Sequence, residues 1–119
     1  MKNLSFIRRV GFALAGIKNT FRRESSFRFQ ILAACLLLVF CLVQRPPAVW
    51  CALFAIISAL VLALELFNTA IEAILDKLHP EHDAQIGFAK DCLAGAVLVA
   101  SFAAVVILGI YLLEVFAIL

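Results

Sequence analysis

The sequence predicts an all-α integral membrane protein, built from an N-terminal amphipathic surface helix and three transmembrane helices. Of the 119 residues, 66% are hydrophobic and 15% are charged, and the mean hydropathy is +1.11. Soluble domains contain about 45–50% apolar and about 25% charged residues, so this composition excludes an ordinary soluble domain. We expect a single domain over residues 1–119 without a cleavable signal peptide, because a basic segment precedes the first long apolar run.

Residues 1–25 are predicted to form the surface helix. Apolar side chains recur at helical spacing along one side of this segment, namely Phe6, Val10, Leu14, Ile17 and Phe21. Basic side chains lie mostly on the other side, namely Lys2, Arg8, Arg9, Lys18, Arg22 and Arg23. Such a helix lies in the membrane interface, where its cations attract anionic headgroups. Nucleic-acid binding, the other interpretation of a basic helix, is disfavoured beside so much apolar sequence.

Three transmembrane helices are predicted over residues 27–43, 48–75 and 90–114. The first two are separated by a turn that contains Pro46 and Pro47, since consecutive prolines cannot continue a helix. The second and third are separated by a polar loop over residues 76–89. Four cysteines lie in or beside the apolar runs without metal-binding spacing, and we interpret them as small apolar residues packed in helices.

The distribution of basic residues predicts the orientation in the membrane. Seven basic residues precede or open the first span, against one arginine in the turn that follows it. The positive-inside rule therefore places the N-terminus in the cytoplasm, and three crossings place the C-terminus on the far side. With this topology, Glu24, the stretch from Glu65 to Asp76, and the Lys90–Asp91 pair all come to the cytoplasmic face.

A polar stripe runs along the second span. Glu65, Asn68, Glu72 and Asp76 fall within an arc of about 80° on a helix. The stripe follows an almost wholly apolar run, and a carboxylate at the bilayer centre costs about 2.5–3.5 kcal/mol on insertion scales. A charge at this depth is therefore a candidate functional group.

The residue types near this stripe suit phosphoryl transfer. Acidic groups gathered at one face would repel one another without a cation, and Mg²⁺ binds through one or two carboxylates plus substrate phosphates. Lys90 could hold a phosphate, and Glu65 could accept a proton from a lipid hydroxyl. The usual phosphate-binding loops GxxxxGK[ST] and GxGxxG are absent from the sequence. From the pattern alone, an interhelical polar seam or the proton relay of a small transporter remains an alternative.

Two blocks, Glu65–Glu72 (ELFNTAIE) and Ala89–Val97 (AKDCLAGAV), resemble the signature of the prokaryotic diacylglycerol kinase family, which includes the undecaprenol kinases. The segment Glu24–Arg28 and the spacing of all three blocks agree, so the resemblance covers nearly the whole chain. It implies a lipid kinase of the bacterial inner membrane, assembled as a homotrimer with shared active sites. The implied reaction moves the γ-phosphate of MgATP to a membrane lipid hydroxyl. Diacylglycerol, which would give phosphatidic acid, is the expected acceptor, and undecaprenol is the alternative.

The resemblance also implies roles for individual residues. Glu65 is the expected general base, and Glu24 and Glu72 are the expected Mg²⁺ ligands. The expected nucleotide-binding residues are Phe12, Glu24, Glu72, Glu81, Asp83, Lys90 and Asp91. The expected lipid-binding residues are Ser26, Phe27, Arg28, Glu65 and Asn68.

The sequence departs from the family pattern at several positions. Ser5 stands where the family has an arginine on the nucleotide side, and Arg8 or Arg9 is expected to replace it. Diacylglycerol kinases of Gram-negative bacteria typically read Ala-Phe-Arg-Gln-Glu where this chain reads Ser-Phe-Arg-Phe-Gln over residues 26–30. The His79–Pro80 pair and the AGAV segment look closer to the undecaprenol kinases.

Overall fold

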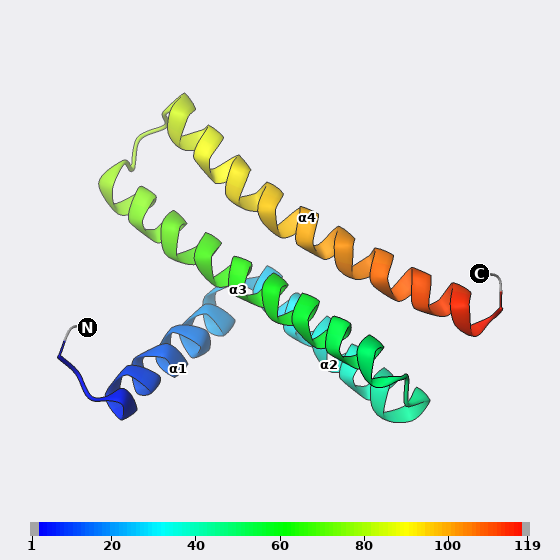
Figure 1. Cartoon of the computed structure of the whole chain (residues 1–119). Coiled ribbons are helices and arrows are strands. Elements are labelled where there is room, and N and C mark those ends of the chain that lie inside the picture. The colour runs from blue at the N-terminus through cyan, green and yellow to red at the C-terminus, as the bar shows by residue number, and fades with distance from the viewer. Residues whose placement is uncertain (1–2, 118–119) are drawn as a thin grey trace.

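The computed structural model describes residues 3–117, which form four α-helices joined by short connections (Figure 1). These are α1 (Phe6–Arg23), α2 (Ser25–Gln44), α3 (Ala48–Leu78) and α4 (Ala84–Val115). The last three are long and apolar enough to cross a membrane. The structure therefore confirms the predicted all-α class with three helices that can span a bilayer.

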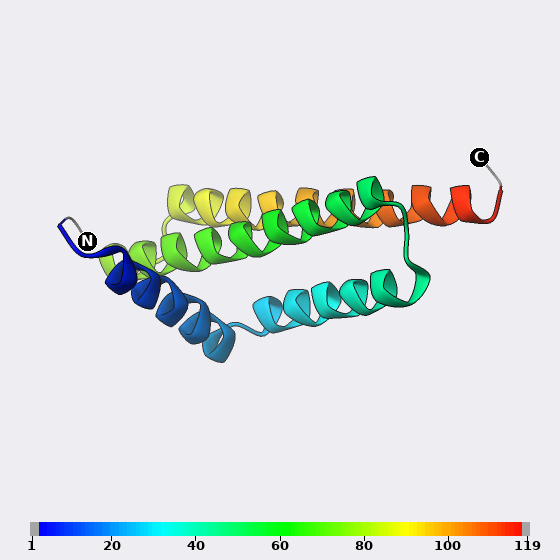
Figure 2. The same cartoon turned by 60° about the horizontal axis from the view of Figure 1, so that its bottom comes forward.

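The three long helices run side by side, and α1 leaves them at an angle (Figure 2). The most extensive packing joins α3 to α4, α2 packs on α3, and α1 touches α2 and α3. Only Thr20 of α1 is buried, and its apolar residues Phe6, Ile7 and Leu14 are exposed. An apolar face left outside the bundle fits the predicted surface helix.

Helices α3 and α4 are longer than the sequence predicts. They contain 31 and 32 residues, or about 46 and 48 Å at about 1.5 Å per residue. Both exceed the hydrocarbon core of about 30 Å, so their ends extend beyond it. The predicted loop over 76–89 is wrong in extent, because only residues 79–83 lie between the two helices. Residues 76–78 and 84–90, which mix polar and apolar side chains, continue the two helices toward the loop.

Local signals explain where helices begin and end. The Ser5 side chain caps α1 by accepting a hydrogen bond from the backbone N–H of Arg8. Arg45 ends α2 in the left-handed conformation, with φ of 50°. Pro47 then stands as the N-cap of α3, where its missing N–H costs no helical hydrogen bond. The two prolines thus produce the predicted turn.

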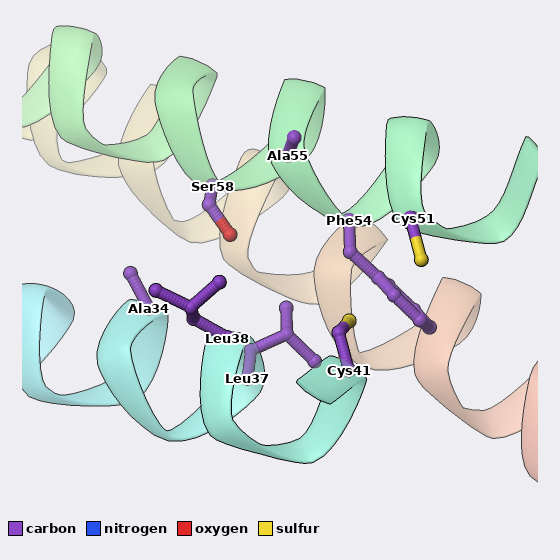
Figure 3. A pocket seen from close by; sticks show the side chains of 8 residues that line it. All are labelled: Ala34, Leu37, Leu38, Cys41, Cys51, Phe54, Ala55 and Ser58. Atoms are coloured by element: carbon purple, nitrogen blue, oxygen red, sulfur yellow. The ribbon is translucent and has the colours of Figure 1, made fainter. Parts of the chain in front are cut away.

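Aromatic packing fixes the end of the bundle that lies away from the polar stripe. The Tyr111 ring of α4 contacts Phe40 of α2 at a centroid distance of 5.8 Å and Phe54 of α3 at 5.7 Å. Trp50 of α3 belongs to the same group, and its ring meets the Tyr111 ring edge-on at a centroid distance of 5.3 Å. Beside it, Cys41 and Cys51 face the same pocket between α2 and α3 (Figure 3). All four cysteines are free thiols, and Cys35 and Cys92 are exposed rather than packed as predicted.

Candidate active site

The α1–α2 junction brings a serine to the deepest acid of the chain. Glu65 is only 3% exposed, and its Oε2 accepts a hydrogen bond of 3.1 Å from the hydroxyl of Ser26. Ser26 belongs to the first turn of α2, and the N-terminus of a helix favours a carboxylate beside it. The buried charge is therefore compensated from one side by a polar helix end.

Two neighbours of Ser26 hold this junction in place. The Phe27 side chain is 2% exposed and packs in the core. The Arg28 Nη1 donates hydrogen bonds to the carbonyl oxygens of Phe21 at 2.7 Å and Arg22 at 3.1 Å. Since these carbonyls lie in the last turn of α1, Arg28 caps that helix and ties it to α2. Both residues were predicted to bind the lipid, which stays a prediction; in the structure their side chains pack in the core and cap α1.

One turn deeper, a second polar contact joins α2 to α4. The Gln30 Nε2 donates a hydrogen bond of 3.2 Å to the Ser101 hydroxyl. This contact fixes the rotation of α2, because polar groups within an apolar bundle have few other partners. Neither residue belongs to the predicted site. A glutamine and a serine in apolar runs were the available signal, but nothing in the sequence pairs them.

A second centre lies where α3 and α4 approach their connecting loop. The Lys90 Nζ forms an ion pair of 2.5 Å with Asp76 Oδ1 and lies close enough to Glu72 for electrostatic interaction. Side chains of this ion pair remain partly exposed to the surroundings. The end of the stripe next to the α3–α4 loop, at Asp76, therefore faces α4, while Glu65 faces α2.

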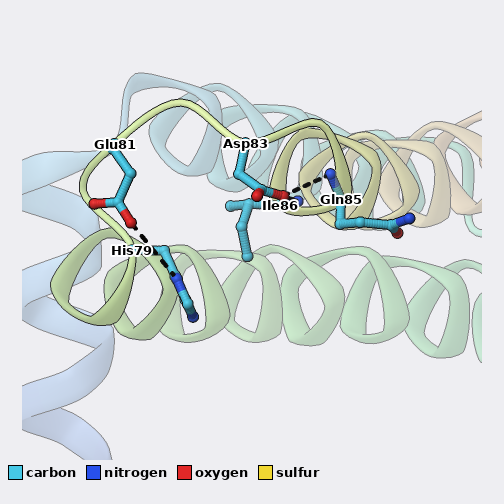
Figure 4. A network of polar contacts seen from close by, with 5 residues as sticks. All are labelled: His79, Glu81, Asp83, Gln85 and Ile86. Atoms are coloured by element: carbon cyan, nitrogen blue, oxygen red, sulfur yellow. Dashed lines mark hydrogen bonds and ion pairs between the residues drawn. The ribbon is translucent and has the colours of Figure 1, made fainter.

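The loop contributes helix capping and a weak ion pair (Figure 4). The Asp83 Oδ1 accepts hydrogen bonds from the backbone N–H groups of Gln85 at 2.8 Å and Ile86 at 3.2 Å. Asp83 is therefore the N-cap of α4. The Glu81 carboxylate lies 4.0 Å from His79 Nδ1, and both side chains are exposed. Residues of the loop and of both helix ends enclose a pocket whose lining includes Asp76, Glu81, Asp83 and Lys90.

The remaining predicted site residues form no side-chain hydrogen bond or ion pair with one another in the described residues. Asn68 has a buried Oδ1 without a hydrogen-bond partner in the described residues. Glu24 forms the half-buried connection between α1 and α2, and Glu72 is half-buried on α3. Phe12 is 50% exposed on α1, and Asp91 is exposed beside Lys90. Across residues 3–117, no three acidic, histidine or cysteine side chains are arranged to hold a metal ion. The individual roles stay predictions.

Fold and site together define a small helical membrane protein in which most acidic residues lie in the half of the bundle near the α3–α4 loop, with Glu114 at the other end. Residues 11–112 match the family described as "Prokaryotic diacylglycerol kinase". This match covers most of the chain, which therefore belongs to that family, and its activity is that of a lipid kinase. Three helices able to span a membrane and this prokaryotic family fit a protein of the inner membrane.

Individual relatives agree with the family. The chain is 35% identical over 103 residues to a diacylglycerol kinase of Synechocystis, covering 86% of this chain and 59% of that protein. It is 31% identical over 100 residues to the diacylglycerol kinase of Escherichia coli K12, covering 84% and 82%. It is 41% identical over 86 residues to the undecaprenol kinase of Bacillus subtilis, covering 71% and 68%. Relatives of both names therefore match most of this chain in sequence.

Proposed function

We propose that the chain transfers the γ-phosphate of MgATP to the hydroxyl of diacylglycerol, giving phosphatidic acid. The observation that carries this proposal is Glu65, a carboxylate buried on a polar stripe in a chain that belongs to a lipid kinase family. A proton-coupled transporter also uses buried acids, but the family match favours the kinase.

Glu65 is the proposed general base. The lipid oxygen attacks the γ-phosphorus, the bond to the β–γ bridging oxygen breaks, and the hydroxyl proton passes to the Glu65 carboxylate. ADP leaves with the bridging oxygen. Asn68 supports this assignment, because its buried Oδ1 lacks a protein partner in the described residues and can accept a hydrogen bond from a substrate hydroxyl or a bound water. It lies one helical turn from Glu65.

Glu24 and Glu72 are the proposed Mg²⁺ ligands. Both are half-buried carboxylates, and hard oxygen ligands fit this ion. The described residues gather no set of three metal-binding side chains, which suits an ion held largely by substrate phosphates. When bound, Mg²⁺ supplies positive charge against the phosphate oxygens.

The nucleotide is proposed to bind at the loop end of α3 and α4. Lys90 provides a cation for a phosphate, and Asp91, Glu81 and Asp83 lie on the neighbouring turns and loop. Phe12 is proposed to lie near the adenine, on the exposed surface of α1. Cytoplasmic ATP would reach this end if the N-terminus is cytoplasmic and the C-terminus lies on the far side, as the basic residues predict.

We also propose a homotrimer with shared active sites. Three membrane helices leave part of the polar stripe half-buried, with Asn68 and Glu72 not fully covered by the chain itself. A neighbouring subunit can cover these groups and add the charges that a single chain does not gather. Lipid enters from the bilayer in this arrangement, and nucleotide enters from the aqueous side.

Undecaprenol is the second candidate acceptor. The chain is 41% identical to an undecaprenol kinase, against 31% to 35% for the diacylglycerol kinases of Escherichia coli and Synechocystis. The two acceptors share a single hydroxyl at the head of an apolar body, so the chemistry at Glu65 is the same for both.

The test is phosphorylation by purified protein in lipid vesicles with labelled ATP, run in parallel with diacylglycerol and undecaprenol. We expect label in phosphatidic acid at a higher kcat/KM than in undecaprenyl phosphate. A preference for undecaprenol would replace the proposed acceptor and keep the proposed chemistry. Label in neither lipid, with the protein still folded by circular dichroism, would contradict the lipid kinase assignment and favour transport.

A further inference from the structure

We propose that Ser26 is a positioning residue, which holds the Glu65 carboxylate in the orientation that accepts the substrate proton. This inference rests on the proposed role of Glu65 as the base. It differs from the lipid contact that the resemblance implies for Ser26, because the hydroxyl acts here through the carboxylate rather than on the lipid.

The two carboxylate oxygens of Glu65 can serve different purposes, one binding Ser26 and the other accepting the substrate proton. The Ser26 Oγ–H donates to Oε2 at 3.1 Å, so Oε1 is the oxygen available for the incoming proton. A long glutamate side chain loses rotamer freedom when its end is fixed. A base that is already oriented contributes to the rate because proton transfer requires hydrogen-bond contact with the substrate hydroxyl.

Ser26 can do this because its own position is fixed from three directions. Phe27 is anchored in the core at 2% exposure. Arg28 binds the last carbonyls of α1, and Gln30 binds Ser101 of α4 one turn further along. The first turn of α2 is therefore held against the bundle, although Ser26 itself is exposed. Its hydroxyl stands between the buried carboxylate and the outside.

The experiment compares Ser26→Ala and Ser26→Thr with Ser25→Ala as the matched control. Ser25 is the adjacent exposed serine of the same helical turn, and its side chain makes no hydrogen bond within the described residues. In lipid vesicles, Ser26→Ala should lower kcat about tenfold or more, the effect of one hydrogen bond to a charged group. The KM values for MgATP and lipid should stay near those of the natural chain. Ser26→Thr keeps the hydroxyl and should recover most of kcat, and Ser25→Ala should change little.

A second measurement needs no substrate. Dicyclohexylcarbodiimide is an apolar reagent that modifies membrane carboxyl groups, and the extent of labelling at Glu65 can be followed by peptide mass spectrometry. Ser26→Ala should label several times faster than the natural chain, because the hydroxyl no longer holds or covers the carboxylate. Ser25→Ala should label at the unchanged rate.

The outcomes separate this proposal from its alternatives. A raised lipid KM with unchanged kcat in Ser26→Ala would show direct lipid contact and overturn the positioning role. Equal losses in Ser26→Ala and Ser25→Ala would indicate a disturbed helix end and also overturn it. If the natural chain phosphorylated no lipid, the proposed function would fail. Unchanged carbodiimide labelling of Glu65 in Ser26→Ala would instead show that the Ser26–Glu65 hydrogen bond is absent and would overturn the positioning role.

Discussion

At the scale of single residues, the chain concentrates its chemistry in a few polar groups on apolar helices. Glu65 is buried with one hydrogen bond from Ser26, while Asp76 and Lys90 form a more exposed ion pair. Both side chains of the Asp76–Lys90 ion pair are partly exposed, and solvent screening makes such a contact a weak source of stability. It leaves the Lys90 ammonium available for exchange onto a phosphate.

Replacement of the base should separate chemistry from nucleotide binding. Glu65→Gln keeps the size of the side chain and removes the proton acceptor, so we expect turnover to be abolished and MgATP binding to stay near normal. Turnover is measured with labelled ATP, and binding by titration with a fluorescent ATP analogue. Substantial remaining turnover would remove Glu65 from the role of base.

Replacement of the proposed metal ligand should have the opposite pattern. Glu72→Gln removes a charge from a half-buried acid that interacts electrostatically with Lys90, so both the apparent Mg²⁺ affinity and the nucleotide affinity should fall. The activity is titrated with Mg²⁺ at fixed ATP. Glu114→Gln, an exposed acid at the far end of α4, is the control that should behave like the natural chain. An Mg²⁺ affinity that is unchanged in Glu72→Gln would argue against ligation.

At the scale of elements, helix ends do much of the positioning. Arg28 closes α1 onto α2, and Asp83 begins α4. The capping role of Asp83 places its Oδ1 on backbone N–H groups, beside the pocket that contains Lys90. One side chain thus serves the helix and lies at the proposed nucleotide site.

Two substitutions at Asp83 test the cap. Asp83→Ala removes both hydrogen bonds and should lower the free energy of unfolding by about 1 kcal/mol, the usual value of an N-cap. Asp83→Asn retains a capping oxygen and should unfold at nearly the natural temperature. Thermal unfolding in detergent micelles measures both. The capping role would be wrong if Asp83→Ala were as stable as the natural chain. A raised KM for MgATP in Asp83→Asn would support the nucleotide role of the charge.

At the scale of the whole molecule, the single chain is an incomplete bundle. Its large apolar residues remain exposed along α2 and α4, for example Leu36, Val39, Leu98, Val99 and Phe102. In a bilayer these surfaces contact lipid tails or other helices. Exposure of apolar side chains to either environment costs no free energy. Polar groups that stay half-buried on α3 are the surfaces that gain most from a neighbouring subunit.

The proposed homotrimer can be tested by measuring the mass of the assembled protein. Native mass spectrometry of the protein released from micelles should give three times the chain mass of 13.0 kDa. The same species should carry the lipid kinase activity when it is isolated by size exclusion. A fully active monomer would contradict the proposed sharing of active sites between subunits.

The sequence by itself determined the class of the protein, the number of spans and the stripe of acids. Apolar runs of sufficient length must leave water, and helical periodicity places Glu65, Glu72 and Asp76 on one side of α3 without knowledge of any contact. The sequence blocks around these acids also indicated the protein family. Helix ends were predicted less well, because the mixed polar and apolar residues at 76–78 and 84–90 can continue a helix as easily as they can form a loop.

Only the tertiary structure decided which groups meet. Ser26 and Glu65 are 39 residues apart, and Gln30 and Ser101 are 71 apart. Their pairing depends on how α2 rotates and slides against α3 and α4. Nearly uniform apolar surfaces on α2 and α4 give no sequence signal for that rotation, because every face is equally compatible with lipid. Side-chain packing of Phe27, Phe54 and Tyr111 selects one arrangement, and the partly buried hydrogen bonds between the helices follow from it.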